Sequence, residues 1–86
     1  MVSAVASDFN VVINSPNELI WEGRAKSVSS TNSVGAFDIL PGHANFVTMI
    51  ESKPIIIRTG TGEHSYTYEN AVLSVQGGTV TIYSGI

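Results

Sequence analysis

The sequence predicts an all-β domain: a small two-sheet β-sandwich or flattened barrel of about 8 to 10 short, mostly antiparallel strands. Three observations support this prediction. Apolar and polar residues alternate with period two over much of the chain, and no segment keeps a helical period for three turns. Turn-forming residues recur at intervals of roughly 8 to 12 residues, the spacing that sandwiches and barrels show.

The first expected strand is indicated by the alternation of apolar and polar residues near the start of the chain. Phe9, Val11 and Ile13 fall on one face, while Asn10 and Asn14 fall on the other. Two later segments alternate in the same way: Leu19 and Trp21 with Glu18 and Glu22, and His64, Tyr66 and Tyr68 with Glu63, Ser65, Thr67 and Glu69. Each pattern indicates a strand with one buried face.

The last hairpin can be predicted with its register. A two-residue Gly77-Gly78 turn opposes Gln76 to Thr79, and the strand pairing then extends outward from these two residues. This register puts one apolar set on a common face: Leu73, Val75, Val80 and Ile82. A slip of one residue would break the pattern, so the pairing is strongly specified.

Two features mark the middle of the chain. Ile55-Ile56-Ile57 is apolar on both faces and predicts a central strand, or one covered by another chain, with Pro54 at its first position. The segment Ile39–Ala44 predicts a buried strand that ends in a rigid corner. Pro41 fixes its own φ, and Gly42 can adopt the positive φ of a sharp reversal.

The composition predicts one domain over residues 1–86. The chain has 43% hydrophobic and only 13% charged residues, so part of its surface should be uncharged, as interface cores and Ser/Thr-rich β domains both are. The net charge of −3 includes only four scattered basic residues, which argues against a nucleic-acid partner. No apolar run is long enough for a spanning helix, so we expect no membrane insertion.

Chemistry-bearing residues are few. There is no cysteine, and no nucleophile–base or carboxylate pair can be placed together, so neither enzymatic activity nor a cofactor or metal is expected. His43 favours an interface or turn role, and His64 a half-exposed position among aromatics. Asp38 should point outward or pair with a cation. Trp21 favours a core anchor over an exposed binding residue, and Gly60-Thr61-Gly62 favours a hairpin turn over a phosphate loop.

Taken together, Phe9 to Tyr83 resembles the N-terminal β-sandwich domain of the epsilon subunit of F-type ATP synthases, the delta subunit in mitochondria. Three blocks carry the resemblance: Val11–Pro16 with Leu19–Gly23 and Ala25–Val28, then Gly35–Ala44, and finally Ala71–Tyr83. The second is the most specific, because it is similar to the family's run ending in proline-glycine-histidine-alanine. The chain departs from that run at Ala36, Asp38 and Asn45.

The resemblance implies a non-catalytic rotor part of the central stalk, bound to the gamma subunit and the c-ring, that couples ion flow to ATP synthesis. By matching positions, the gamma-facing candidates are Ser15, Pro41, Gly42 and His43, and the c-ring candidates are Asn32, Ser33, Gly35 and Ala36. The complex would place the domain peripherally at the cytoplasmic face of the inner membrane, or the equivalent organellar face. Nothing in the chain corresponds to the family's C-terminal two-helix hairpin, so its inhibitory and ATP-binding roles are not expected here.

Two further expectations come from the residues themselves. An uncharged partner-facing surface predicts self-association of the isolated domain. An alternative function is a small-ligand-binding β-barrel, because Tyr66 and Tyr68 share a strand and charge is scarce. That alternative requires an enclosed pocket of about 300 Å³ or more, lined by the two rings.

Overall fold

The computed structural model describes residues 7–85, so residues 1–6 and 86 of the predicted domain lie outside the described part. Nine strands form within these residues, and no helix does. Their bounds are β1 Phe9–Asn14, β2 Leu19–Ala25, β3 Ser27–Thr31, β4 Ala36–Ile39, β5 Phe46–Ile50, β6 Pro54–Arg58, β7 Glu63–Thr67, β8 Ala71–Gln76 and β9 Thr79–Ser84. The prediction of an all-β fold with short strands is confirmed.

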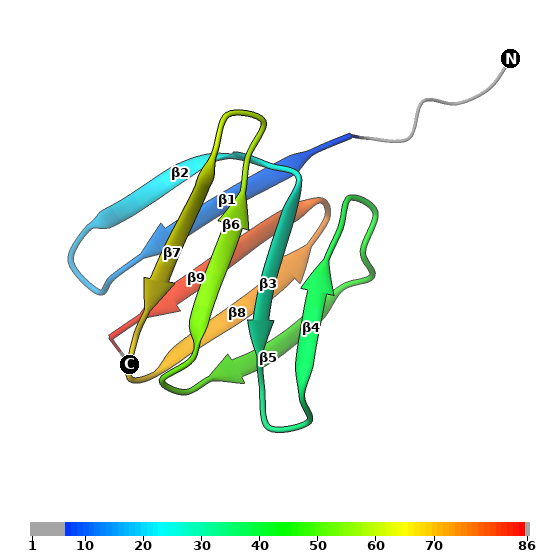
Figure 1. Ribbon diagram of the computed structural model, residues 1–86. Helices are drawn as coiled ribbons and strands as arrows, with labels where there is room; N and C mark the ends of the chain where they lie inside the picture. The colour runs from blue at the N-terminus through cyan, green and yellow to red at the C-terminus, as the bar shows by residue number, and fades with distance from the viewer. Residues whose placement is uncertain (1–6, 86) are drawn as a thin grey trace, which may run out of the picture.

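The strands form two sheets that pack face to face (Figure 1). One sheet has five strands in the order β2-β1-β9-β8-β5, and the other has four in the order β4-β3-β6-β7. All strand pairs are antiparallel except β1 and β9, which run parallel. The predicted two-sheet sandwich is therefore the observed architecture, with β6 inside its sheet as the three isoleucines indicated.

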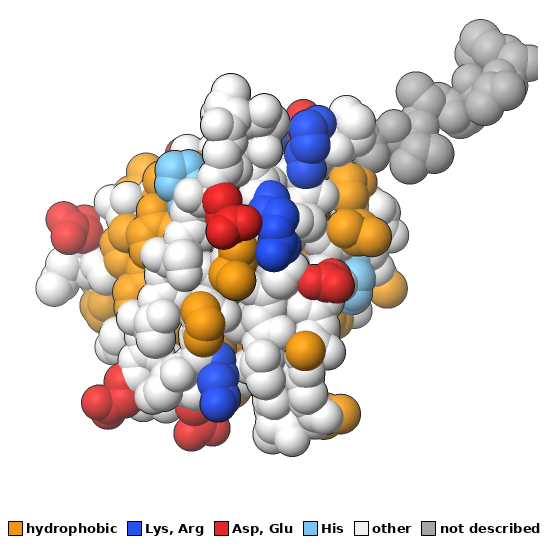
Figure 2. Space-filling view, viewed as in Figure 1, with side chains coloured by type: hydrophobic (Ala, Val, Ile, Leu, Met, Phe, Trp, Pro, Cys, Tyr) orange, Lys and Arg blue, Asp and Glu red, His pale blue; other side chains and the backbone are white. Residues whose placement is uncertain are grey.

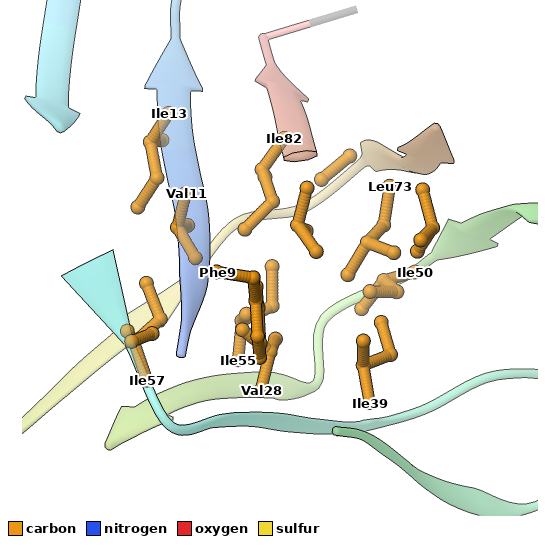
Figure 3. Close-up of a cluster of buried hydrophobic side chains, with 14 residues drawn as sticks. Phe9, Val11, Ile13, Val28, Ile39, Ile50, Ile55, Ile57, Leu73 and Ile82 are labelled. Carbon is orange, nitrogen blue, oxygen red and sulfur yellow. The ribbon is translucent and has the colours of Figure 1, made fainter. Parts of the chain in front are cut away.

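The core lies between the sheets and is built from the inward residues of both (Figure 3). Val11, Ile13 and Ile82 come from the five-stranded sheet, and Ile55 and Ile57 from the four-stranded sheet, all with 0% exposure. Fully burying such a side chain contributes about 1.5–3 kcal/mol relative to leaving it exposed. Because every contributing strand alternates, the pleat decides which residues enter this core.

The closing hairpin adopts the register that its turn predicts. Gln76 pairs with Thr79, Val75 with Val80 and Leu73 with Ile82. Gly77 and Gly78 both have positive φ, as the two-residue turn requires. Burial then follows the alternation, because the four predicted apolar side chains are all buried.

The prediction that Trp21 anchors the core is only partly right. Trp21 lies on the edge strand β2, where its half-buried ring packs against the core and folds over Gly23. The ring also lies 5.2 Å from that of His64, on the edge strand of the other sheet. Trp21 therefore closes one side of the sandwich instead of filling its centre, and His64 is exposed rather than half-buried.

Candidate partner-binding surfaces

The Pro41–His43 corner connects β4 with β5 and has the predicted geometry. Gly42 has φ 83°, and the N–H of His43 donates to the carbonyl of Leu40 across the turn. His43 is exposed: its Nδ1–H donates to the carbonyl of Ala44 at 2.7 Å, and its ring lies 5.4 Å from that of Phe46. His43 therefore stabilises the turn through these contacts, while its side chain remains exposed at the surface.

Ser15 occupies a separate turn between β1 and β2. Its hydroxyl donates to the carbonyl of Glu18 and accepts from the N–H of Glu18, each at 3.2 Å. The structure does not bring Ser15 next to His43, because Ser15 follows the end of β1 whereas the corner lies beside its first residue, Phe9. With about 3.3 Å per residue, the six residues of β1 separate the two by about 20 Å.

The c-ring candidates form the β3–β4 turn. Asn32 organises it, because its side-chain oxygen accepts from the N–H groups of Val34 and Gly35, at 2.9 and 3.2 Å. Its amide nitrogen donates to the hydroxyl of Thr48 on β5. The turn is thus fixed to the neighbouring sheet, while the side chain of Val34 at its tip is 93% exposed.

One outer face carries no charged side chain. The outward residues of β1, β9, β8 and β5 are held in one sheet by the strand registers, and we call them the uncharged face. Its members are Asn10, Val12, Asn14, Val47, Met49, Val72, Ser74, Gln76, Thr79, Thr81 and Tyr83. Charged groups return at its borders, at Glu22 and Arg24 on the edge strand β2 and at Glu51 just after β5.

An apolar row crosses this face and continues onto β2. Leu19 pairs with Asn14, Asn14 with Tyr83, Tyr83 with Val72, and Val72 with Met49. We call the apolar members Leu19, Tyr83, Val72 and Met49 the apolar band. Leu19, Tyr83 and Met49 are 54%, 45% and 49% exposed, and Val47 beside the band is 66% exposed. Asn14 separates Leu19 from Tyr83, whereas Tyr83, Val72 and Met49 are direct neighbours. A cluster of exposed apolar groups of this kind is typical of a surface that a partner covers.

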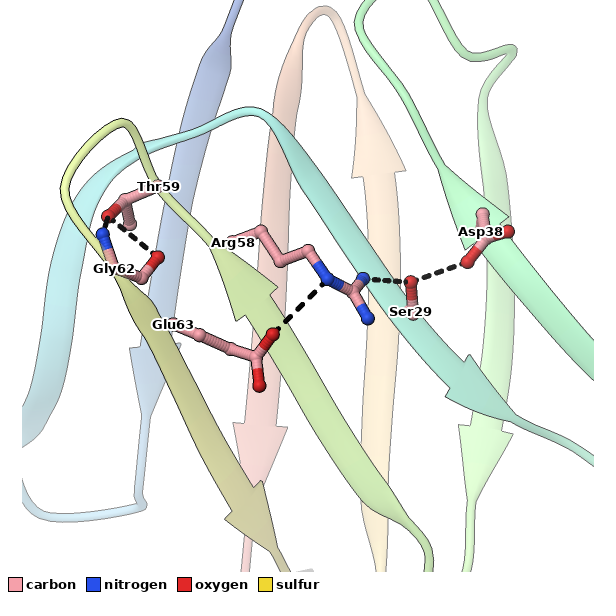
Figure 4. Close-up of polar contacts among 6 residues, drawn as sticks. All are labelled: Ser29, Asp38, Arg58, Thr59, Gly62 and Glu63. Atoms are coloured by element: carbon pink, nitrogen blue, oxygen red, sulfur yellow. Dashed lines mark hydrogen bonds and ion pairs between the residues drawn. The ribbon is translucent and has the colours of Figure 1, made fainter.

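The outer face of the four-stranded sheet differs in kind. A polar row runs across all four strands there (Figure 4). Arg58 pairs with Glu63 at 3.3 Å and donates to the hydroxyl of Ser29, which itself donates to Asp38. Asp38 therefore points outward, as the sequence indicated. Figure 2 shows acidic and basic side chains side by side on this face, which we call the charged face.

The cavities do not match the ligand-barrel alternative. One, of about 130 Å³, lies among Thr31, Asn32, Ser33, Met49, Glu51 and Lys53, and a second, of about 10 Å³, lies beside the Gly42 corner. Neither is lined by Tyr66 or Tyr68, which stack at 6.3 Å and pack against the core. Burial, and to a smaller extent the nearby Tyr66, raise the pKa of Tyr68. Neither of these two cavities is the pocket, lined by both tyrosine rings, that the alternative requires.

Sequence reasoning predicted an uncharged surface from the composition, but it did not locate that surface on the fold and it missed the apolar band. The signal was present, because alternation from Phe46 and Ile50 places Val47 and Met49 on the opposite face, and the hairpin register does the same for Val72 and Tyr83. What was not available was the lateral order of β1, β9, β8 and β5, which joins these positions into one row.

The architecture is a two-sheet β-sandwich with one uncharged, partly apolar outer face, and the comparisons identify its family. The family model "ATP synthase, Delta/Epsilon chain, beta-sandwich domain" matches residues 8–85. The chain belongs to this family. The resemblance identified from the three sequence blocks is therefore confirmed.

Curated relatives include two ATP synthase epsilon chains. That of Streptomyces avermitilis is 29% identical over 77 residues, which is 90% of this chain and 57% of the relative. That of Bordetella avium is 34% identical over 76 residues, which is 87% of this chain and 54% of the relative. The chain thus spans about half the length of these relatives.

Two solved structures share the fold. A chain in the Euglena gracilis mitochondrial ATP synthase, solved as OSCP/F1/c-ring, matches with TM-score 0.84 at 15% identity over 95% of this chain and 53% of that one. A chain in the central stalk/c-ring of the Tetrahymena thermophila mitochondrial ATP synthase matches with TM-score 0.76 at 11% identity, over 90% of this chain and 63% of that one.

Proposed function

We propose that this domain is a non-catalytic rotor component of the central stalk of an F-type ATP synthase. It binds the gamma subunit and rests on the c-ring, and so helps to couple ion flow to ATP synthesis. Family membership and the central-stalk and c-ring assemblies of the structural neighbours support this proposal. The observation that carries it is the uncharged face with its apolar band.

The gamma subunit covers the uncharged face in this proposal. Ser15 and the Pro41–His43 corner flank the five-stranded sheet at opposite ends, so a partner that lies across the face can reach both. The face offers uncharged hydrogen-bonding groups around exposed apolar ones, which is the composition of an interface core. The sheet beneath it is rigid, because the buried core holds its inner side.

Cysteine protection tests this contact. The chain contains no cysteine, so Thr81→Cys on the uncharged face and Ser65→Cys on the charged face each provide a single labelling site. Adding the cognate gamma subunit should give co-elution in size exclusion and slow maleimide labelling of the Thr81→Cys variant at least tenfold, an order-of-magnitude expectation for a desolvated interface centre. The Ser65→Cys variant should label at an unchanged rate. Failure to co-elute, or equal protection at both positions, contradicts the proposal.

The c-ring contact lies at the β3–β4 turn, formed by Asn32, Ser33, Gly35 and Ala36. The argument for this turn is its fixed backbone and its exposed tip at Val34. A cysteine at Ser33 should cross-link to a c subunit in the assembled complex, whereas one at Thr61, in the β6–β7 turn, should not. Cross-linking from Thr61 with none from Ser33 contradicts this assignment.

The location follows from the partners. A domain on the c-ring lies peripherally at the membrane, on the cytoplasmic face or its organellar equivalent. Among the described residues no helix could span a membrane. Cell fractionation with the intact complex tests this location: the domain should sediment with membranes and be released by treatments that detach the stalk.

A further inference from the structure

The two sheets have four edge strands, and one of them lacks the usual protection. Exposed edges are normally blunted by charged side chains, because their free N–H and C=O groups can pair with another chain. β2 carries Glu22 and Arg24, β4 carries Asp38, and β7 carries Glu63. β5 carries none, and the chain from Ile39 to Ile50 contains no Asp, Glu, Lys or Arg.

Among the described residues, the edge of β5 that faces away from β8 carries no strand, although the β3–β4 turn contacts β5 through Asn32, whose amide donates to the hydroxyl of Thr48. Within residues 7–85 the strand pairs only with β8, so its other edge has no ladder partner. Val47 and Met49 on β5 are 66% and 49% exposed. The strand consists of Phe46, Val47, Thr48, Met49 and Ile50, residue types that suit strands, with no Pro or Gly to interrupt pairing.

We propose that β5 pairs antiparallel with β5 of a second copy of this chain, about a two-fold axis at Thr48. Thr48 then faces Thr48 of the second copy, Val47 faces Met49, and Phe46 faces Ile50. Each exposed apolar residue, Val47 or Met49, thus faces an exposed apolar residue of the second copy. Each inward apolar residue, Phe46 or Ile50, likewise faces an inward apolar residue. A two-fold contact of this kind uses the same strand on both copies.

Charge also favours this register. Each chain has net charge −3, so two copies repel overall, and a stable contact must add no like-charge pair of its own. In the two-fold register the flanking Glu51 faces the amide side chain of Asn45, not a second carboxylate. A register shifted by one residue would place Val47 of one copy opposite Thr48 of the other, on the same face of the joint sheet. Exposed Val47 and the less exposed Thr48 lie on opposite faces of β5, so the alternation of burial opposes this register.

The consequence is one continuous sheet made from two five-stranded sheets. The apolar band of each copy, which ends at Met49, then continues through Val47 of the other copy. The shared edge is short and lies below the roughly 1,600 Å² of a standard interface, so the dimer should be weak. This pairing does not depend on the proposed rotor function, because it requires only the free edge.

Disulfide trapping with the whole chain tests the register. Directly opposed strand residues have Cα atoms about 4.5–5.5 Å apart, within disulfide range. Thr48→Cys should therefore form an intermolecular disulfide under mild diamide oxidation at least about tenfold faster than Val47→Cys, whose two copies lie diagonally at about 7–8 Å. Val47 is the matched control because its greater exposure would favour it in random collisions.

Sedimentation velocity supplies the second measurement. The unmodified chain should dimerise between about 10 µM and 1 mM, and Val47→Lys should raise the dissociation constant at least about tenfold, since a lysine blocks edge pairing. The proposal is overturned if the chain stays monomeric throughout or if the Val47→Cys variant cross-links as fast as the Thr48→Cys variant. It is also overturned if the Thr48→Cys variant cross-links only to an added gamma subunit, because the edge then belongs to that partner.

Discussion

The two sheets have the same chemistry inside and opposite chemistry outside. The centre of the core takes fully buried aliphatic residues from both sheets, such as Leu73 and Ile57. Outward, the five-stranded sheet presents amides, hydroxyls and the apolar band, whereas the four-stranded sheet presents the hydrogen-bonded row centred on Arg58. The inner faces therefore determine the fold, and the outer faces differ in what they can bind.

The two outer faces also differ in how their exposed apolar residues are arranged, singly on one face and as neighbours on the other. Ile56 lies on the charged face between hydroxyl-bearing neighbours, Ser29 and Ser65, and is half-buried. On the uncharged face, Tyr83, Val72 and Met49 are direct neighbours across three strands. A single outward aliphatic residue is ordinary on a protein surface, but a row of them across a sheet indicates a partner.

The largest expected effect tests whether the inner faces are equivalent. Leu73→Ala in the five-stranded sheet and Ile57→Ala in the four-stranded sheet should each lower the free energy of unfolding by about 2–5 kcal/mol, because both remove fully buried methyl groups. Urea unfolding followed by tryptophan fluorescence measures both. A loss below about 1 kcal/mol at either site would show that one sheet does not depend on the shared core.

A smaller effect is expected from the polar row. Arg58→Met removes the ion pair with Glu63 and the hydrogen bond to Ser29, both partly exposed, and should cost only about 0.5–1 kcal/mol. Part of this loss should vanish in high salt, which screens exposed pairs. Thr81→Val on the uncharged face is the control and should change stability by less than about 0.5 kcal/mol. Equal losses for the two variants would remove the distinction between the faces.

The smallest effect concerns alkaline pH. The raised pKa of Tyr68 means that the unfolded chain, with a tyrosine pKa of about 10, loses its proton first. The contribution of the Tyr68 hydroxyl to the free energy of unfolding is complete below about pH 10. It is lost as the pH rises through the higher pKa that Tyr68 has in the folded state. Thermal unfolding from pH 8 to 11 should show a shallower alkaline decline for Tyr68→Phe than for the parent chain. Parallel curves would contradict the burial of this hydroxyl.

Local patterns predicted the elements well, and their lateral order poorly. The Gly77-Gly78 hairpin could be predicted with its register because turn chemistry and alternation act within a few residues. The parallel pairing of β1 with β9 could not, because it joins Asn10 with Thr79, far apart in the sequence. The location of the uncharged face depends on that pairing, so only the fold could show where the predicted uncharged surface lies.

Edge positions were the second source of error. Alternation predicted that Leu19 and Trp21 share a buried face. Trp21 does face inward, but the register shift beside Asn14 leaves Leu19 exposed, so that part of the prediction was wrong. Nor could alternation show that β2 lies at an edge, where the Trp21 ring is only partly covered. The same limit applies to the predicted partner contacts. Local motifs identified the Ser15 turn and the Gly42 corner separately, whereas their placement at opposite ends of β1 follows from the tertiary structure.

The most direct test of the central claim compares one lysine on each outer face for binding to the cognate gamma subunit. Tyr83→Lys on the uncharged face should weaken binding by a factor of at least about 10, because the buried charge would lack a partner. Ile56→Lys on the charged face should leave the affinity within about twofold, the expectation for a substitution outside the interface. Equal affinities for the two variants, or a greater loss from Ile56→Lys, would contradict the assignment of the binding face.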